Sequence, residues 1–88
     1  MASRTWFITG TSRGFGREWA LAALERGDRV VGTARNPGSM DDIAARYSSD
    51  RFLPLALDVT DRAAAFATVA RAHDHFGELD IVVNNAGY

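Results

Sequence analysis

The stretch that decides the fold reads Thr9-Gly10-Thr11-Ser12-Arg13-Gly14-Phe15-Gly16. It follows the apolar run Trp6-Phe7-Ile8 and opens a helical pattern. Gly10, Gly14 and Gly16 let the backbone turn tightly and approach another group closely, because no Cβ stands in the way. A glycine-rich turn from a strand into a helix gathers free N–H groups at the positive end of the helix dipole. The stretch therefore predicts a site for the diphosphate of a nucleotide; the alternative is a tight loop with a purely structural role.

Strand signals and helix signals alternate along the rest of the chain. We expect strands at 5–9, 29–33, 51–57 and 80–83, and helices at 15–26, 40–47 and 60–76. Such alternation is typical of a parallel sheet with helices on both faces. The first helix is expected to bury Gly16, Ala20, Ala23 and Leu24 against the sheet and to end at Gly27.

Finer local signals concern the helix starts, one strand and the last helix. Ser39 and Thr60 are predicted N-caps. Pro54 favours an edge position for the third strand. The stripe predicted to be buried along the last helix consists of Phe66, Val69, Ala70, His73 and Phe76.

Composition bounds the class of protein. The 88 residues are 47% hydrophobic and 24% charged, which is ordinary for a soluble globular domain. A net charge of −1 gives no sign of a nucleic-acid partner or a polybasic membrane anchor. The absence of cysteine excludes disulfides and thiolate metal sites, and no apolar run approaches the roughly 20 residues that span a bilayer. We expect a cytoplasmic protein without a metal site.

Two arginines bear on the choice of cofactor. Arg13 lies within the glycine turn, and Arg35 directly follows the second strand. In a dinucleotide-binding fold the end of the second strand meets the adenosine ribose, where an acid binds a 2′-OH and an arginine accommodates a 2′-phosphate. The residues Thr33-Ala34-Arg35 contain no acid. This favours NADP(H) over NAD(H); the alternative is two solvated surface arginines.

Two further segments follow predicted strands. Asp58 and Val59 come after the third strand, where the carboxylate could accept a hydrogen bond from an adenine amino group; alternatively, it only favours the start of the next helix. Asn84-Asn85-Ala86-Gly87 ends the fourth strand, at the edge of the sheet where ligands bind, or is an ordinary turn.

Taken together, these segments resemble the classical branch of the short-chain dehydrogenase/reductase family. The glycine turn resembles the family's Thr-Gly-x-x-x-Gly-x-Gly motif, Asp58-Val59 its adenine-binding pair, and residues 84–87 its Asn-Asn-Ala-Gly motif. The resemblance covers almost the entire chain. It implies a Rossmann-type α/β fold, a doubly wound parallel sheet with strand order 3-2-1-4.

The resemblance also implies roles for individual residues. Ser12, Arg13, Gly14 and Phe15 would surround the diphosphate and the adjacent ribose, and Gly10 and Gly16 of the same motif would also belong to the cofactor-binding site. Phe15 takes a place usually given to Ile or Leu near the nicotinamide. Arg35 would hold the 2′-phosphate, and Asp58 and Val59 would contact adenine. The central part of the cofactor would be lined by Asn85, Ala86 and Gly87, whereas Asn84 would steady the sheet.

The chain departs from the family in length and in its catalytic residues. Family members are well over twice as long, and their chemistry depends on a Ser and a Tyr-x-x-x-Lys motif that cannot be placed in these 88 residues. Tyr88 directly follows the Asn-Asn-Ala-Gly motif and has no Lys after it, so no catalytic residue is assigned. Residues 1–88 are thus expected to form one NAD(P)-binding domain, truncated at its C-terminal side and inactive alone.

Three functional hypotheses remain open. The first is the cofactor-binding half of an NADP(H)-dependent oxidoreductase, which transfers hydride between nicotinamide and a carbonyl or alcohol substrate. The second is a non-catalytic nucleotide-sensing or interaction module, and the third is a remnant that binds nothing. In each case the fourth strand is expected to be an unpaired edge, which favours self-association into a homo-oligomer.

Overall fold

The computed structural model describes residues 3–85, so the predicted contacts of Ala86 and Gly87 lie outside the described residues. The elements are β1 (Thr5–Ile8), α1 (Gly14–Glu25), β2 (Arg29–Ala34), the 3-10 turn η1 (Pro37–Met40), α2 (Asp41–Arg46), β3 (Phe52–Ala56), α3 (Arg62–Phe76) and β4 (Ile81–Val83).

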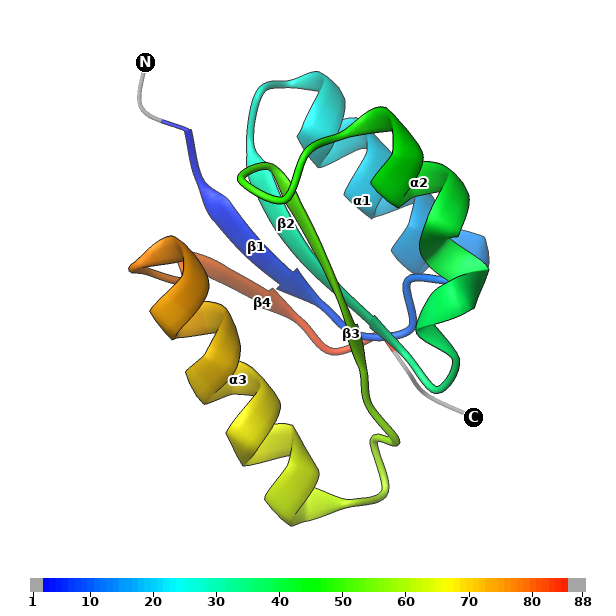
Figure 1. Ribbon diagram of the computed structural model, residues 1–88, viewed down its shortest axis with the longest axis vertical. Helices are drawn as coiled ribbons and strands as arrows, with labels where there is room; N and C mark the ends of the chain where they lie inside the picture. The colour runs from blue at the N-terminus through cyan, green and yellow to red at the C-terminus, as the bar shows by residue number, and fades with distance from the viewer. Residues whose placement is uncertain (1–2, 86–88) are drawn as a thin grey trace.

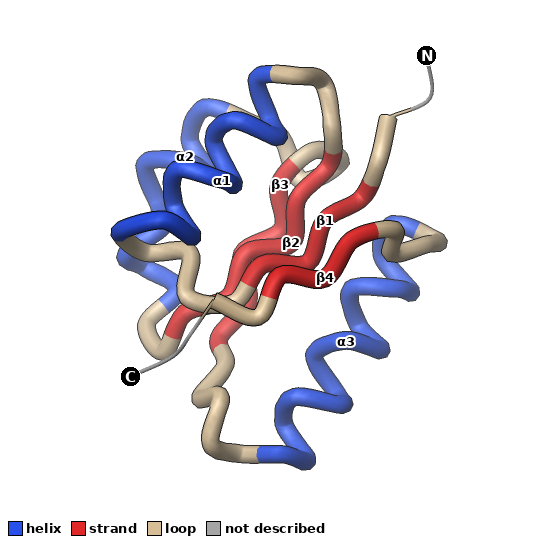
Figure 2. Tube along the Cα trace, turned by 180° about the vertical axis from the view of Figure 1, so that it is seen from behind, coloured by secondary structure: helices blue, strands red, loops and turns tan. Residues whose placement is uncertain are grey.

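The four strands form a parallel sheet in the order β3-β2-β1-β4, which confirms the predicted order. Phe7 of β1 is in register with Val31 of β2 on one side and with Val82 of β4 on the other. Helices α1 and α2 cover one face of the sheet and α3 covers the other (Figure 1). The view from behind shows the sheet between these two layers (Figure 2). The chain therefore has the doubly wound, Rossmann-type architecture that its sequence predicts.

Both faces of the central strands are buried, because successive side chains of a strand point to opposite faces. Phe7 faces α3, whereas Ile8 faces α1 and α2. The buried residues on the α3 side are Phe7, Val31, Leu55 and Ala72. Those on the other side are Ile8, Ala20, Ala23, Leu24, Val30, Ala34, Met40, Ile43 and Phe52. Burial of each large aliphatic side chain contributes about 1.5–3 kcal/mol, so the layer beneath α1 and α2 holds most of the core.

Helix α1 packs and ends as its sequence predicts. Its buried face consists of Gly16, Ala20, Ala23 and Leu24. After the C-cap, the Gly27 N–H donates to the Leu24 carbonyl at 3.1 Å, and the Asp28 N–H donates to the Ala23 carbonyl at 3.0 Å. These two bonds form a Schellman motif, which satisfies carbonyls that a helix end would otherwise leave unpaired.

Both N-caps predicted from the sequence are wrong by one residue, because α2 follows Met40 and α3 follows Asp61. Ser39 lies inside η1, whose N-cap is Asn36, and α2 begins after it without a side-chain cap. Asp61, and not Thr60, caps α3 by accepting a hydrogen bond from the Ala64 N–H at 3.1 Å. Ser39 is taken up by the 3-10 turn that precedes α2, whereas at the start of α3 the path of the loop selects Asp61 over the adjacent Thr60.

The predicted buried stripe of α3 is also largely wrong. Its members Phe66, Val69, Ala70 and His73 are exposed, and only Phe76 is partly buried. The buried positions are Thr68 and Ala72. Small side chains there allow α3 to lie close to the sheet, and the Thr68 hydroxyl donates to the Ala64 carbonyl at 2.7 Å, which removes the penalty of burying it.

Pro54 lies in β3 at one edge of the sheet, as predicted, and β4 forms the other edge among the described residues. Within residues 3–85, no helix is both long and apolar enough to cross a membrane.

Candidate functional site

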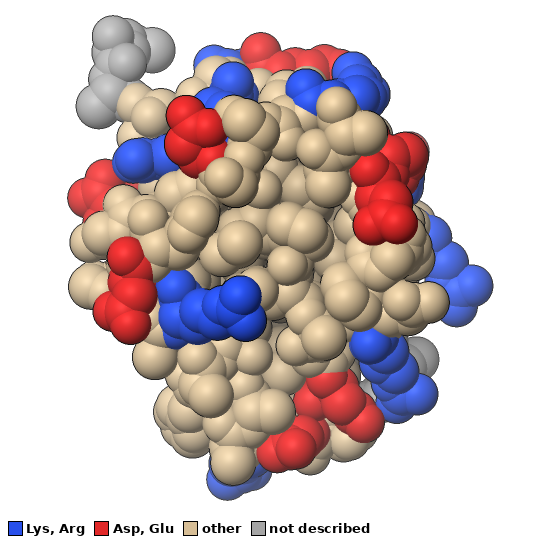
Figure 3. Space-filling model, in the orientation of Figure 1, with Lys and Arg blue, Asp and Glu red and all other residues tan. Residues whose placement is uncertain are grey.

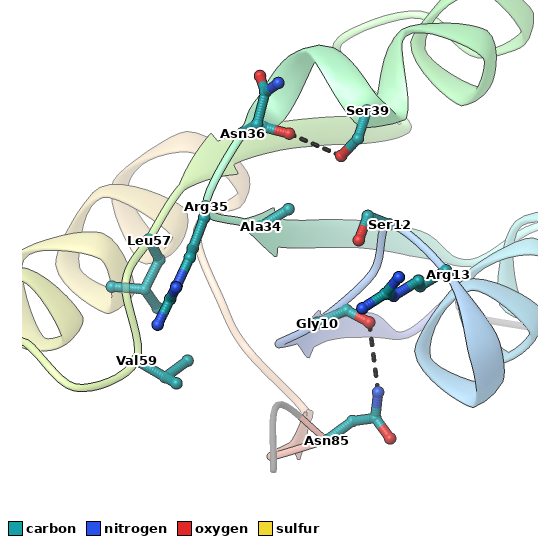
Figure 4. A pocket seen from close by; sticks show the side chains of 10 residues that line it. All are labelled: Gly10, Ser12, Arg13, Ala34, Arg35, Asn36, Ser39, Leu57, Val59 and Asn85. Carbon is teal, nitrogen blue, oxygen red and sulfur yellow. Dashed lines mark hydrogen bonds between the residues drawn. The ribbon is translucent and has the colours of Figure 1, made fainter. Parts of the chain in front are cut away.

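A cleft of about 730 Å³ opens where the strands end. Its lining residues are Gly10, Ser12, Arg13, Ala34, Arg35, Asn36, Ser39, Leu57, Val59 and Asn85 (Figure 4). Ala34 is the last residue of β2, and the others come from the segments that follow β1, β2, β3 and β4. Ligands of open parallel sheets bind at the carboxyl ends of the strands, where the order of connections reverses. The cleft occupies this position.

The glycine turn has a backbone that requires glycine. Gly10 and Gly14 adopt φ values of 66° and 65°, in the left-handed region that other residues rarely enter. Gly16 is required for a different reason, since a Cβ on it would lie 2.2 Å from the carbonyl oxygen of Gly10 and 2.5 Å from the side-chain nitrogen of Asn85. The first turn of α1 thus packs directly on the backbone of the turn.

Hydrogen bonds fix the turn to the neighbouring strands. The Thr11 N–H donates to the Thr33 carbonyl at 2.9 Å, and the Thr11 hydroxyl donates to the Ile8 carbonyl at 2.7 Å. On the other side, the Asn85 side-chain amide donates to the Gly10 carbonyl at 3.3 Å. The turn is therefore held from both sides before any ligand arrives.

The end of β4 is tied to the end of β1 through Thr9. The Asn85 N–H donates to the Thr9 hydroxyl at 2.9 Å, and this hydroxyl donates to the side-chain oxygen of Asn84 at 3.2 Å. Asn84 contacts the sheet and not the cleft, whereas Asn85 lines the cleft. The two asparagines that the sequence places in one motif thus have different surroundings.

The N-terminus of α1 suits an anion. Arg13 is its N-cap residue, has an extended backbone and makes no side-chain capping bond. The first turn of the helix carries no acidic residue. Backbone N–H groups at the positive end of the helix dipole therefore lack the side-chain acceptor that usually satisfies them, and a phosphate would supply the missing acceptor.

The two arginines extend into the cleft from opposite walls, Arg13 from the start of α1 and Arg35 beside Val59 (Figure 4). The Arg35 side chain is 73% exposed, and its guanidinium lies 3.8 Å from the Asp58 carboxylate. An exposed pair at this distance is weak, so Arg35 can exchange its partner for a stronger anion.

Asp58 lies between the cleft-lining residues Leu57 and Val59 but does not itself line the cleft, and hydrogen bonds hold it firmly. One of its oxygens, Oδ1, accepts hydrogen bonds from the Thr60 hydroxyl at 2.7 Å and from the Thr60 N–H at 3.0 Å. These two bonds lower the pKa of Asp58 below its ordinary value despite partial desolvation, and the Arg35 charge acts in the same direction. The carboxylate is therefore ionised at neutral pH, and no contact within residues 3–85 engages its second oxygen.

Sequence reasoning did not assign Asn36 and Ser39 to the site. The sequence indicates a turn at 36–38, and in the structure Asn36 accepts a hydrogen bond from the Gly38 N–H at 3.0 Å. The Ser39 hydroxyl donates to the Asn36 carbonyl at 2.6 Å, and both residues line the cleft. The position of this turn in the sequence could have indicated that it belongs to the site. Because it directly follows β2, it must lie at the same edge of the sheet as the glycine turn, which follows β1. Ala34 and Leu57 line the cleft for the same reason.

Three predicted residues of the glycine turn lie beside the cleft and do not line it: Gly14, Phe15 and Gly16. The Phe15 side chain is 68% exposed and stacks on Trp19, with ring centroids 5.8 Å apart. Arg17 supports the turn from behind, because it donates to the Ser12 carbonyl at 3.4 Å and forms an ion pair with Asp42 of α2.

The face of the molecule seen in Figure 3 has no basic patch that would compete with the cleft for an anion. Basic and acidic side chains are interspersed there. The electrostatic field of the whole molecule adds little to anion binding, because the net charge is only −1. The attraction of an anion to the cleft therefore depends on the nearby arginines and on the start of α1.

Comparisons with known proteins agree with this geometry. The family model described as short chain dehydrogenase matches residues 4–88. The oxidoreductase BOA17 of Botryotinia fuckeliana is 45% identical over 86 residues, which cover 98% of this chain and 31% of BOA17. A short-chain dehydrogenase from Streptomyces avermitilis is 43% identical, with a TM-score of 0.93 over 98% of this chain and 31% of that one.

A third relative was solved with a cofactor. It is the 3-ketoacyl-(acyl-carrier-protein) reductase from Brucella melitensis complexed with NADH, 30% identical, with a TM-score of 0.81 over 90% of this chain and 32% of that one. The present chain thus spans about a third of the length of these three relatives. The family match over residues 4–88, the strand order and the glycine-turn site together establish that this chain belongs to the short-chain dehydrogenase family.

Proposed function

We propose that this chain binds the adenosine end of NADP(H) in the cleft at the carboxyl ends of its strands. The observation that carries the proposal is the pair of arginines on opposite walls of the cleft, Arg35 and Arg13, of which Arg13 is the N-cap residue of α1. A 2′-phosphate placed between them would accept charge-assisted hydrogen bonds from both guanidinium groups. The end of β2 carries no acid that would repel it.

The cleft offers a place for each part of the nucleotide. The diphosphate would lie on the glycine turn at the start of α1, where Gly10 and Gly14 leave room for close approach. Adenine would lie along Leu57 and Val59, and the free oxygen of Asp58 would accept a hydrogen bond from its amino group. Asn85 would line the central part of the cofactor, and Ala86 and Gly87 are assigned there by the motif alone.

Within a chain as long as its relatives, this segment would be the cofactor-binding part of an oxidoreductase that acts on a carbonyl or alcohol substrate. NADP(H) supplies the hydride acceptor or donor in such a reaction. The residues described here bind and orient the adenosine end, and no proton-transfer role falls on any of them. We therefore expect no turnover from these 88 residues alone.

Titration of the chain with NADPH and with NADH, followed by tryptophan fluorescence, tests the proposal. Trp19 stacks on Phe15 beside the glycine turn and is a suitable reporter. The Arg35→Asp variant should weaken NADPH binding at least tenfold and leave NADH binding nearly unchanged, because only NADPH carries the 2′-phosphate. Arg46→Asp makes the same charge change at the far end of α2 and serves as the control. Equal loss of both cofactors in Arg35→Asp, or no binding by the parent chain, would refute the proposal.

A further inference from the structure

We infer that Asp58 limits the preference of this cleft for a 2′-phosphate, because it holds Arg35 in an ion pair that the phosphate must displace. The inference rests on the proposed function. Its structural basis is the approach of the Arg35 guanidinium to within 3.8 Å of Oδ1 of Asp58, a residue that directly precedes the cleft-lining Val59. Asp58 is thereby a specificity-determining residue as well as a candidate adenine ligand.

The carboxylate cannot easily turn away from Arg35. Both hydrogen bonds from Thr60 end on Oδ1, the same oxygen that faces the guanidinium. The Asp58 side chain is 49% exposed and lies in the segment that joins β3 to α3, so it is not buried by packing. The Thr60 bonds are what orient it, and no hydrogen bond among the described residues uses the second oxygen.

The two oxygens therefore have opposing consequences for a bound nucleotide. The free oxygen favours any adenine nucleotide, whether or not it carries a 2′-phosphate. The oxygen facing Arg35 acts against the 2′-phosphate alone, since a phosphate monoester carries about −1.5 to −2 charges at neutral pH. The phosphate must replace Asp58 as the partner of Arg35, and it does so only at the cost of that ion pair.

The test compares two small ligands on the full chain, adenosine 2′,5′-bisphosphate and 5′-AMP, by calorimetric titration at low ionic strength. Their affinity ratio reports the exchange of the 2′-OH for a 2′-phosphate, because the adenine, the 5′-phosphate and the rest of the ribose are common to both. In Asp58→Asn the ratio should rise about two- to fivefold, the range expected for an exposed ion pair. Asparagine keeps an oxygen that accepts the Thr60 bonds, and loss of the adenine contact cancels in the ratio.

Two controls isolate the mechanism. Asp61→Asn removes the same charge three residues away and preserves the α3 cap, so its ratio should match that of the parent chain. In an Arg35→Ala background, Asp58→Asn should leave the ratio nearly unchanged, because the pair no longer exists. If Asp58→Asn does not fold, Asp58→Ser, which can still accept the Thr60 N–H, replaces it.

The outcomes separate this inference from the proposed function. A ratio that is unchanged or lower in Asp58→Asn, while both ligands still bind, would overturn the role of Asp58 and leave the site intact. A rise that persists in the Arg35→Ala background would also overturn it. Failure of the parent chain to bind either ligand would overturn the proposed function itself.

Discussion

The backbone N–H of Asn85 donates a 2.9 Å hydrogen bond to the side-chain hydroxyl of Thr9, which lies 76 positions earlier in the chain. The same hydroxyl donates to the side chain of Asn84 at 3.2 Å. Thr9 therefore joins the ends of the neighbouring strands β1 and β4. The glycine turn directly follows β1, and the asparagine motif directly follows β4. This small group sets the spacing between two walls of the cleft.

Replacing Thr9 with valine should destabilise the chain by about 1–3 kcal/mol, since the Asn85 N–H and the Asn84 side chain lose their partner. Urea unfolding monitored by circular dichroism measures the change. Thr33→Val is the matched control, because the buried Thr33 hydroxyl has no hydrogen-bond partner among the described residues. That variant should be neutral or more stable than the parent. Equal losses in both variants would contradict the role of Thr9.

Gly16→Ala should destabilise the chain by about 1–3 kcal/mol and abolish nucleotide binding. The added methyl group would lie 2.2 Å from the backbone carbonyl of Gly10, which cannot rotate away as a side chain could. This clash exceeds the gain of roughly 0.5–1 kcal/mol that alanine brings to a helix. Gly14→Asn is the contrasting variant, because no atom lies within 4 Å of its Cβ position and asparagine tolerates positive φ. Its unfolding free energy should fall by less than about 1 kcal/mol.

Asp28 should make stability depend on acid pH. Burial opposes its ionisation, but hydrogen bonds from the Arg4 N–H and the Trp6 indole, with the charges of Arg26 and Arg4, hold the pKa of Asp28 below its ordinary value of 3.8. A carboxyl group with a depressed pKa in the folded state stabilises it above the unfolded pKa and loses this effect as pH falls through the folded pKa.

The measurement is the urea midpoint of the parent chain and of Asp28→Asn between pH 7 and pH 2.5. The variant should be less stable by about 1–3 kcal/mol at pH 7, because an amide offers one acceptor to two donors. The difference should stay constant down to about pH 5 and narrow below about pH 4. Trp6→Phe removes only one of the two donors to Asp28. The stability difference between this variant and the parent chain should therefore narrow less at acid pH than the difference for Asp28→Asn. A difference that does not vary with pH would exclude ionisation of Asp28 as its source.

Self-association should follow from the open edge at β4. Val82 of this strand is 62% exposed, and β4 pairs only with β1 among the described strands. An unpaired strand edge is a template for another chain. Sedimentation at tens of micromolar should therefore show species larger than a monomer, and Val82→Lys should shift them toward monomer. Phe66→Lys changes the exposed face of α3 and distinguishes association through this helix from association through the strand edge. If the strand edge is responsible, the variant should have little effect on the distribution of species.

The sequence alone determined the four strands, the three α-helices, their order and the position of the glycine turn, but it indicated only a turn where η1 lies. The buried face of α1, its end at Gly27 and the edge position of Pro54 were also predicted correctly. These features depend on side-chain periodicity and backbone freedom over a few consecutive residues, which a sequence displays directly. The position of Arg13 and Arg35 at the cleft could be predicted in the same way, because each follows a strand whose end position the topology fixes.

Only the tertiary structure decided which face of α3 is buried and which residues share the cleft. Apolar periodicity favoured Phe66 and Val69, but close packing on the sheet selected the smaller Thr68 and Ala72. Arg35 meets Asp58, and Thr9 meets Asn85, because the parallel crossovers bring strand ends together across 23 and 76 positions respectively. Contacts of this kind depend on the relative placement of whole elements, and no local pattern in the sequence encodes that placement by itself.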